Sequence, residues 1–179
     1  APILSIPKLG EHHRIFTYEK SENNQNIMVA FTQLEPNCQI RRLKGKPVFD
    51  FYWLMNREKY KPVAALIKRK IRQRLQLENS NNSDSFQVIL KDISELNPEL
   101  ENRSLTVRAS KDLKGQCQVQ ATLPSEPGSS EPLLVLNRIF TQVEKTWNPL
   151  DRKIISIQLS GLNEKTGAPI SRAIKSKRK

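Results

Sequence analysis

The sequence predicts an α+β domain, in which a curved antiparallel β-sheet or partial barrel of about seven to nine strands packs around one principal amphipathic helix. Short apolar runs recur along the chain and are separated by turn residues, as in a β-rich fold. One segment, 61–77, has helical spacing and ends in a polar turn. A chain of 179 residues with 37% apolar side chains is long enough for one folded core.

The first predicted strands are 14–20, 26–34 and 47–55. The turn ENNQN joins the first two as a hairpin, because asparagine tolerates left-handed backbone. The third strand is the densest aromatic run in the chain, and both of its faces are substantially apolar. This pattern predicts a central strand that is covered on both sides.

The principal helix is predicted over 61–77, with Pro62 in its first turn and ENSNNSDS after its end. A step of about 100° per residue places an apolar half opposite a basic face. The apolar half comprises Val63, Ala64, Leu66, Ile67, Ile71 and Leu75, and the basic face comprises Lys68, Arg69 and Arg72. Lys70 and Arg74 project from within the apolar half, so they break the pattern.

The rest of the chain reads as β-sheet. The predicted strands are 86–93, 104–110, 115–123, 153–161 and 168–174, with a long surface loop at 124–132 and a hairpin loop, LNEKTGAP, before the last strand. The segment 136–147 is ambiguous, because its apolar residues have helical spacing while its β-branched and aromatic content suits a strand. The surrounding strands favour a strand.

Charge is concentrated in two places. The net charge is +12, of which the basic residues within 68–74 of the helix contribute five and those within 172–179 another five. Such charge attracts nucleic acid, anionic lipid or an acidic polymer without selecting among them. The predicted organisation is an irregular lead-in at 1–13, a single domain at 14–174 and a basic tail at 175–179.

The compartment is predicted from the chain start and the cysteines. The sequence begins Ala-Pro, and a small first residue is what signal peptidase leaves, so we expect a secreted or periplasmic monomer. Its apolar runs are too short to cross a bilayer. Cys38 and Cys117 match no metal-binding spacing, and they either form a disulfide or remain two buried thiols.

Several stretches together resemble a family of bacterial exported domains of unknown function. They are NIMVAF, GKPVFDFYWLM and LIKRKI, followed much later by IISIQLSGLNEKTGAPIS, within about 14–75 and 152–174. The chain departs from that family at Arg74, Leu75 and Gln76, where the family tends to have an aromatic residue. The resemblance implies a secreted or periplasmic protein, and it assigns no activity and no functional residue.

No catalytic, metal or cofactor site is predicted. His12 and His13 have only Glu11 as an obvious further metal ligand. Nucleophile-elbow and phosphate-loop patterns do not occur in the sequence. Asp50 with Glu58 could perform acid–base chemistry, but an acid on an apolar strand is more often paired with a basic neighbour.

The predicted ligand site lies between the helix and the aromatic strand. There Lys70 and Arg74 would line the rim of an apolar groove and hold an anionic headgroup, over a floor of Phe49, Phe51, Tyr52 and Trp53. In the competing interpretation, Lys70 and Arg74 reach water or pair with Asp50 or Glu58.

The predicted function is therefore a non-enzymatic exported binding module for an anionic or amphiphilic ligand associated with the cell envelope. The first alternative is sequence-nonspecific nucleic-acid binding through the basic surface Lys68, Arg69 and Arg72 with the tail. The second is an enzyme of unknown type, which would require Asp50 and Glu58 to meet in a cleft.

Overall fold

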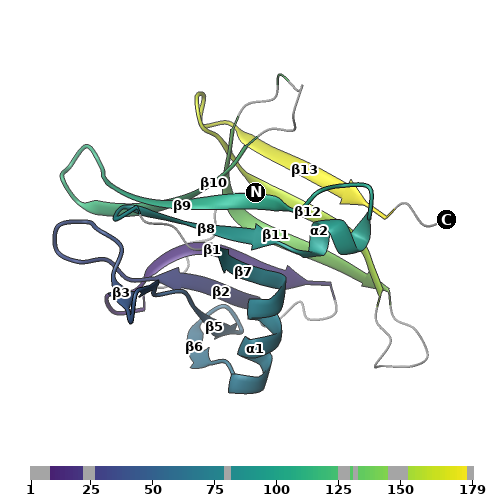
Figure 1. Cartoon of the computed structure of the whole chain (residues 1–179), viewed down its shortest axis with the longest axis horizontal. Helices are drawn as coiled ribbons and strands as arrows, with labels where there is room; N and C mark the ends of the chain where they lie inside the picture. Colours follow the sequence, from purple (N-terminus) through teal and green to yellow (C-terminus); the bar gives the residue numbers. More distant parts are fainter. Residues whose placement is uncertain are drawn as a thin grey trace.

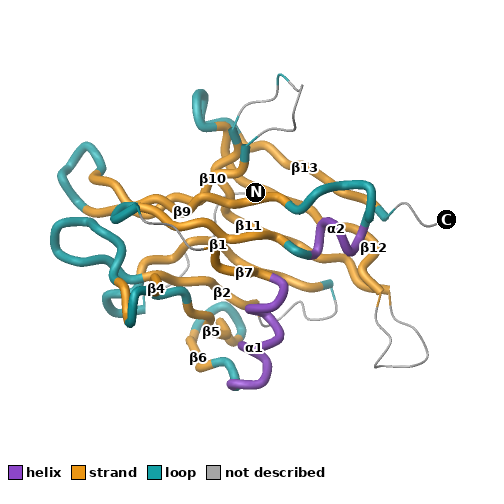
Figure 2. Tube along the Cα trace, in the orientation of Figure 1, coloured by secondary structure: helices purple, strands orange, loops and turns teal. Residues whose placement is uncertain are grey.

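The computed structural model describes residues 9–21, 27–78, 82–124, 130, 133–144 and 153–176. These residues form mostly β-sheet, with eleven strands in one curled sheet and two in a small hairpin (Figure 2). The large sheet contains β1 (His13–Lys20), β2 (Ile27–Thr32), β5 (Asp50–Met55), β6 (Lys59–Pro62), β7 (Leu75–Glu78), β8 (Ser85–Leu90), β9 (Arg103–Lys111), β10 (Cys117–Leu123), β11 (Leu134–Glu144), β12 (Lys153–Asn163) and β13 (Pro169–Lys175). The hairpin contains β3 (Arg42–Leu43) and β4 (Lys46–Pro47), and the helices are α1 (Ala65–Arg74) and α2 (Asp92–Leu96).

The large sheet follows the order β6-β5-β2-β1-β11-β10-β9-β8-β7 and curls into a half-barrel (Figure 1). All of its pairings are antiparallel except that of β1 with β11. Strand β11 branches the sheet, because it pairs with β10 at its start, with β1 further on and with β12 along its length. The β12–β13 hairpin therefore extends from the half-barrel as a separate ribbon.

One glycine is needed where β11 and β12 pair. The register shifts between Leu136 and Arg138, opposite Gly161. A Cβ atom at Gly161 would collide with the carbonyl oxygen of Val135. Only glycine therefore allows this close approach of the two backbones.

The predicted α+β class with one principal helix is wrong, because the segment 61–77 is only partly helical. Its first residues belong to β6, which pairs with β5, and its last belong to β7, which pairs with β8. Residues 65–74 alone remain as α1. The curled, largely antiparallel sheet that the sequence predicted is present, but the sheet itself forms most of the structure.

Two further segments differ from or clarify the sequence prediction. The predicted strand 86–93 ends at Leu90, and α2 begins at Asp92. The ambiguous segment 136–147 is a strand as far as Glu144, and its last three residues lie outside the described residues. No helix in the part of the chain that the structure describes is long and apolar enough to cross a membrane.

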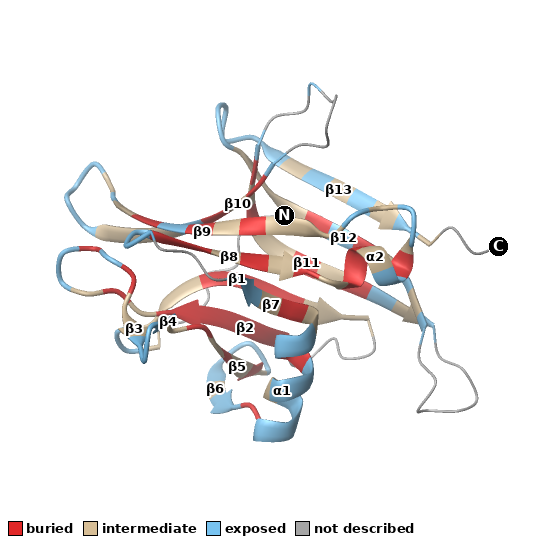
Figure 3. Ribbon diagram, in the orientation of Figure 1, coloured by how far each residue is buried: buried red, intermediate tan, exposed pale blue. Residues whose placement is uncertain are grey.

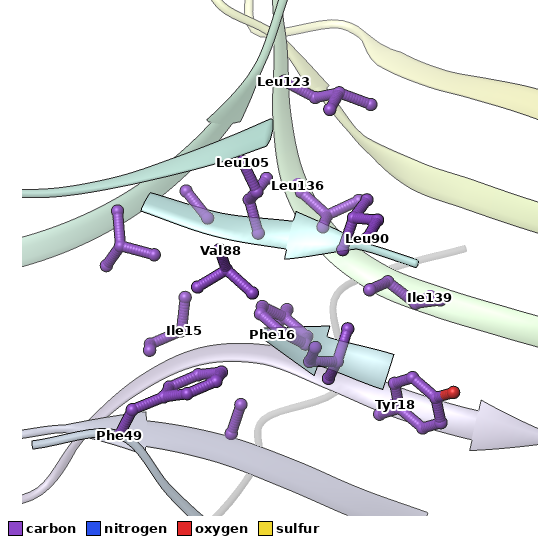
Figure 4. Close-up of a cluster of buried hydrophobic side chains, with 14 of the residues drawn as sticks. Ile15, Phe16, Tyr18, Phe49, Val88, Leu90, Leu105, Leu123, Leu136 and Ile139 are labelled. Carbon is purple, nitrogen blue, oxygen red and sulfur yellow. The ribbon is translucent and has the colours of Figure 1, made fainter. Parts of the chain in front are cut away.

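The main core fills the interior of the half-barrel (Figure 4). Phe16, Phe51, Phe86 and Leu105 are fully buried there, on strands from both halves of the curled sheet. A smaller cluster covers the opposite face of β2 and β5, and it comprises Ile27, Val29, Phe31 and Leu54 with Leu9, Tyr52 and Tyr60 against them. Strand β5 is thus covered on both faces, although it lies next to the edge strand β6.

Cys38 and Cys117 form a disulfide, with Cα atoms 5.3 Å apart across a sequence separation of 79. It ties the turn after β2 to the first residue of β10. In the chain-entropy account, closing a loop of this length stabilises the folded state by about 4 kcal/mol. The sequence left open whether these cysteines form a disulfide or remain two buried thiols, and in the structure they form the disulfide.

Candidate anion-binding surface on helix α1

Helix α1 connects the two edges of the half-barrel. It follows the edge strand β6 and leads directly into the opposite edge strand β7, so it crosses the gap between them (Figure 1). The helix has no side-chain N-cap and no acidic residue in its first turn. Ten residues are too few for a stable isolated helix in water. We conclude that contacts with the sheet edges hold α1 in place.

The first half of α1 is fastened to β5. The Lys68 ammonium lies 2.6 Å from Asp50 Oδ1 and 5.7 Å from the centre of the Tyr52 ring. The same Asp50 oxygen accepts the Phe51 backbone N–H at 2.8 Å. One turn further along the helix, Arg72 donates to the Phe49 carbonyl oxygen at 3.2 Å. Two side chains of the predicted solvated face therefore help to dock the helix.

The end of α1 is fastened to α2 and β1. Arg74 Nη1 lies 3.8 Å from Asp92 Oδ1, and the Tyr18 hydroxyl donates to Asp92 Oδ2 at 2.8 Å. Asp92 is 5% exposed, and burial raises the pKa of its carboxyl. Burial also raises the pKa of the Tyr18 hydroxyl, so the hydroxyl stays protonated and can donate the hydrogen bond to Asp92. A buried carboxylate with a tyrosine and an arginine thus joins three elements.

Asp92 also borders a small internal cavity. Its Oδ1 atom has no hydrogen-bond partner in the structure, and the cavity beside it has a volume of about 10 Å³. The other walls are mostly apolar and include Leu90, Ile139 and Leu159. A space of this size is at the lower limit for one water molecule, so the cluster is a structural joint and offers no room for a ligand.

The six residues of the predicted groove do not gather around one site. Phe49 and Phe51 are buried in the main core, where the centres of their rings lie 4.9 Å apart. Trp53 packs against the same core, whereas Tyr52 lies on the other face of β5. Arg74 reaches Asp92, and Lys70 is exposed.

An open groove runs along the other side of α1, with a volume of about 590 Å³. The residues that line it are Ala65, Lys68, Arg69, Arg72, Gln73, Gln76 and Leu77. These positions recur every three or four residues, so they form one stripe along the helix and into β7. Arg69 is exposed and forms no ion pair with any residue that the structure describes. The predicted basic surface thus borders a solvent-filled groove.

The exposed face of α1 also carries apolar side chains. Leu66 is 63% exposed and Ile67 is 40% exposed, although the sequence placed both in the buried half. Figure 3 shows most of α1 in the colour of exposed residues. Within α1 only Ile71 is buried. The exposed surface that contains Arg69, Lys70, Leu66 and Ile67 is called the outer face of α1 below.

Other candidate groups do not form a reactive site. Asp50 begins β5 and Glu58 follows its end in the turn to β6, so the length of a strand separates them. The His12 ring packs edge-on against Phe31 and Tyr52. Within the described ranges, no three His, Cys, Asp or Glu side chains are grouped for metal binding.

The joint between Tyr18, Asp92 and Arg74 was not predicted. Only one local signal pointed to part of it: Asp92 is followed three residues later by Glu95, a pattern typical of a helix start. Nothing local indicated that Tyr18, 74 residues away, would donate to Asp92.

Comparison with known proteins finds no matching protein family, curated protein or solved structure. The resemblance to exported bacterial domains stays a prediction.

Proposed function

We propose that the protein is an exported, non-enzymatic module that binds an anionic ligand associated with the cell envelope, and that α1 is its binding element. The observation that carries this proposal is the groove along α1, which is lined by Lys68, Arg69 and Arg72. Arginine side chains bind phosphate and carboxylate oxygens through paired N–H donors. Lys68 and Arg72 are partly engaged by the sheet, so Arg69 is the principal free cation of the groove.

The local charge supports the same assignment. Residues 57–76, which include α1 and parts of both edge strands, contain eight basic residues and one acidic residue, a net charge of +7. Lys59 and Lys61 on β6 are exposed and precede the helix. Positive charge clustered in this way attracts anions and accelerates their encounter with the protein, more strongly at low salt.

Export is supported by the disulfide between Cys38 and Cys117. Stable disulfides are typical of secreted and periplasmic proteins and rare in the cytosol. Alkylation of free thiols in freshly lysed cells, followed by mass spectrometry, tests this part of the proposal. Protein in which both cysteines are alkylated would contradict export.

The anion-binding proposal is tested with inorganic polyphosphate as the probe, by isothermal titration calorimetry at several salt concentrations. The variant Arg69→Gln, which removes the principal free cation of the groove, should bind about tenfold more weakly than the unmodified protein, because a charge-assisted phosphate contact is lost. The matched control is Lys165→Gln, which removes one exposed charge from the turn after β12. We expect this control to bind almost as tightly as the unmodified protein.

Equal losses in both variants would contradict the proposal, because binding would then depend on net charge alone. Nucleic-acid binding is a second outcome that the same design detects, with duplex DNA as a further probe. Tyr52 and Trp53 pack within the two clusters beside β5, which leaves the groove without an aromatic platform for bases. Duplex DNA binding much tighter than polyphosphate binding would favour the nucleic-acid alternative.

A further inference from the structure

The outer face of α1 combines two properties that a soluble anion does not need. Around the helix, the order of positions is Arg69, Gln73, Leu66, Lys70, Arg74 and Ile67, so the two apolar side chains stand among cationic ones. Leu66 and Ile67 are substantially exposed. A single exposed leucine is ordinary on a protein surface, but an apolar pair interleaved with cations resembles the side of an interfacial helix.

The chemistry of this face selects one kind of partner. A second copy of the chain is disfavoured, because each copy carries a net charge of +12. Nucleic acid would use Arg69 and Lys70 but leave Leu66 and Ile67 in water. An anionic bilayer accommodates both kinds of side chain, since its headgroups pair with cations and its acyl boundary receives apolar groups.

We infer that the partner of the outer face is an anionic lipid bilayer, on which α1 lies with Leu66 and Ile67 in the acyl boundary and Arg69 and Lys70 among the lipid phosphates. This inference rests on the proposed function, because it names the envelope component that carries the anions. Lys59 and Lys61, which are exposed on the adjacent strand β6, would add contacts with the headgroups.

The way α1 is held agrees with this arrangement. Its sheet-facing contacts are made through Lys68, Ile71 and Arg74, and they leave Leu66 and Ile67 exposed. The helix can therefore meet a surface without leaving the half-barrel. Figure 1 shows α1 at the rim of the molecule, clear of the β12–β13 ribbon.

The test measures sedimentation of the full chain with vesicles of phosphatidylglycerol and phosphatidylcholine, and with vesicles of phosphatidylcholine alone. We expect binding to the anionic vesicles only. The variant Leu66→Ser/Ile67→Ser should lower vesicle affinity at least about tenfold, since two apolar side chains no longer leave water. It should bind polyphosphate as the unmodified protein does.

The matched control is Leu113→Ser, which removes a fully exposed leucine from the turn between β9 and β10, far from α1. This control should bind vesicles with unchanged affinity. Undiminished vesicle binding by Leu66→Ser/Ile67→Ser would overturn the bilayer inference. So would an unmodified protein that binds polyphosphate but not anionic vesicles, and in both cases the anion-binding proposal would stand. Failure to bind either probe would overturn both proposals.

Discussion

The two attachments of α1 use the same kind of chemistry in different surroundings. At the first, Lys68 meets Asp50 at 2.6 Å, and the two side chains remain 23% and 25% exposed. At the second, Arg74 approaches Asp92 only to 3.8 Å, and the Asp92 side chain is 8% exposed. The first pair is closer, but water screens it more effectively.

This difference shows that distance alone does not rank ion pairs. A partly exposed pair contributes little, because water already stabilises both charges. A buried carboxylate has lost its water, so removal of a partner leaves a charge that nothing compensates. The longer contact at Asp92 should therefore matter more for stability than the shorter contact at Asp50.

The largest expected effect follows from removal of Arg74. Arg74→Met should lower the free energy of unfolding by about 3 kcal/mol at neutral pH, because the buried Asp92 carboxylate loses the guanidinium beside it. Lys70→Met, on the outer face of the same helix, should change it by less than about 0.5 kcal/mol. Urea denaturation of both variants measures the difference. Similar losses in the two would show that burial of Asp92 does not set the ranking.

The next effect comes from the tyrosine. Tyr18→Phe removes the 2.8 Å hydrogen bond to Asp92 and should cost about 2 kcal/mol, since the carboxyl is buried. Tyr52→Phe is the control, because the Tyr52 side chain is only half-buried against the smaller core cluster of β2 and β5, and its change should be within about 0.5 kcal/mol. Thermal unfolding followed by circular dichroism measures both variants. If only Tyr52→Phe lowered the stability, the hydrogen bond to the buried Asp92 would not be the more important of the two tyrosine contacts.

A smaller, pH-dependent effect should distinguish Asp92 from an ordinary surface acid. Burial raises the pKa of its carboxyl above the value of 3.8 expected in the unfolded chain. Between those two pKa values the folded protein binds more protons than the unfolded chain, so the Asp92 contribution to stability falls as pH rises. Below pH 3.8 this contribution is fully present. The unfolding free energy of the unmodified protein, relative to that of Asp92→Asn, should therefore decrease as pH rises through this window.

Chemical denaturation of the unmodified protein and Asp92→Asn at a series of pH values tests this sign. A relative stability that increases with pH would mean that Arg74 and Tyr18 outweigh the cost of burying the carboxylate.

The smallest expected effect is at the other attachment. Asp50→Asn retains an oxygen for the Phe51 N–H but removes the charge that faces Lys68, and we expect a loss below about 1 kcal/mol. The loss should shrink further in high salt. Denaturation at low and high ionic strength measures it, and a loss as large as that of Arg74→Met would contradict our account of screening.

Much of the sheet was predictable from local pattern. Alternation located the strands that became β1, β2, β5, β9, β10 and β12, because one or both faces of each pack into a core. The pairing of Asp50 with a basic neighbour was also predictable, since an acid on an apolar strand requires a partner. The identity of that neighbour, Lys68, was not predictable, because it depends on the rotation of α1 about its axis.

By itself, the sequence determined the positions of these strands, the charge of the helix and the cysteines available for a disulfide. The tertiary structure decided how much of 61–77 is helical, since Lys59–Pro62 and Leu75–Glu78 exchange helical hydrogen bonds for pairing with β5 and β8. It also decided that Leu66 faces solvent, because a short helix attached at both ends takes the rotation that its attachments impose. Helical periodicity reports which residues share a face, but only the distant strands and Asp92 determine which face is buried.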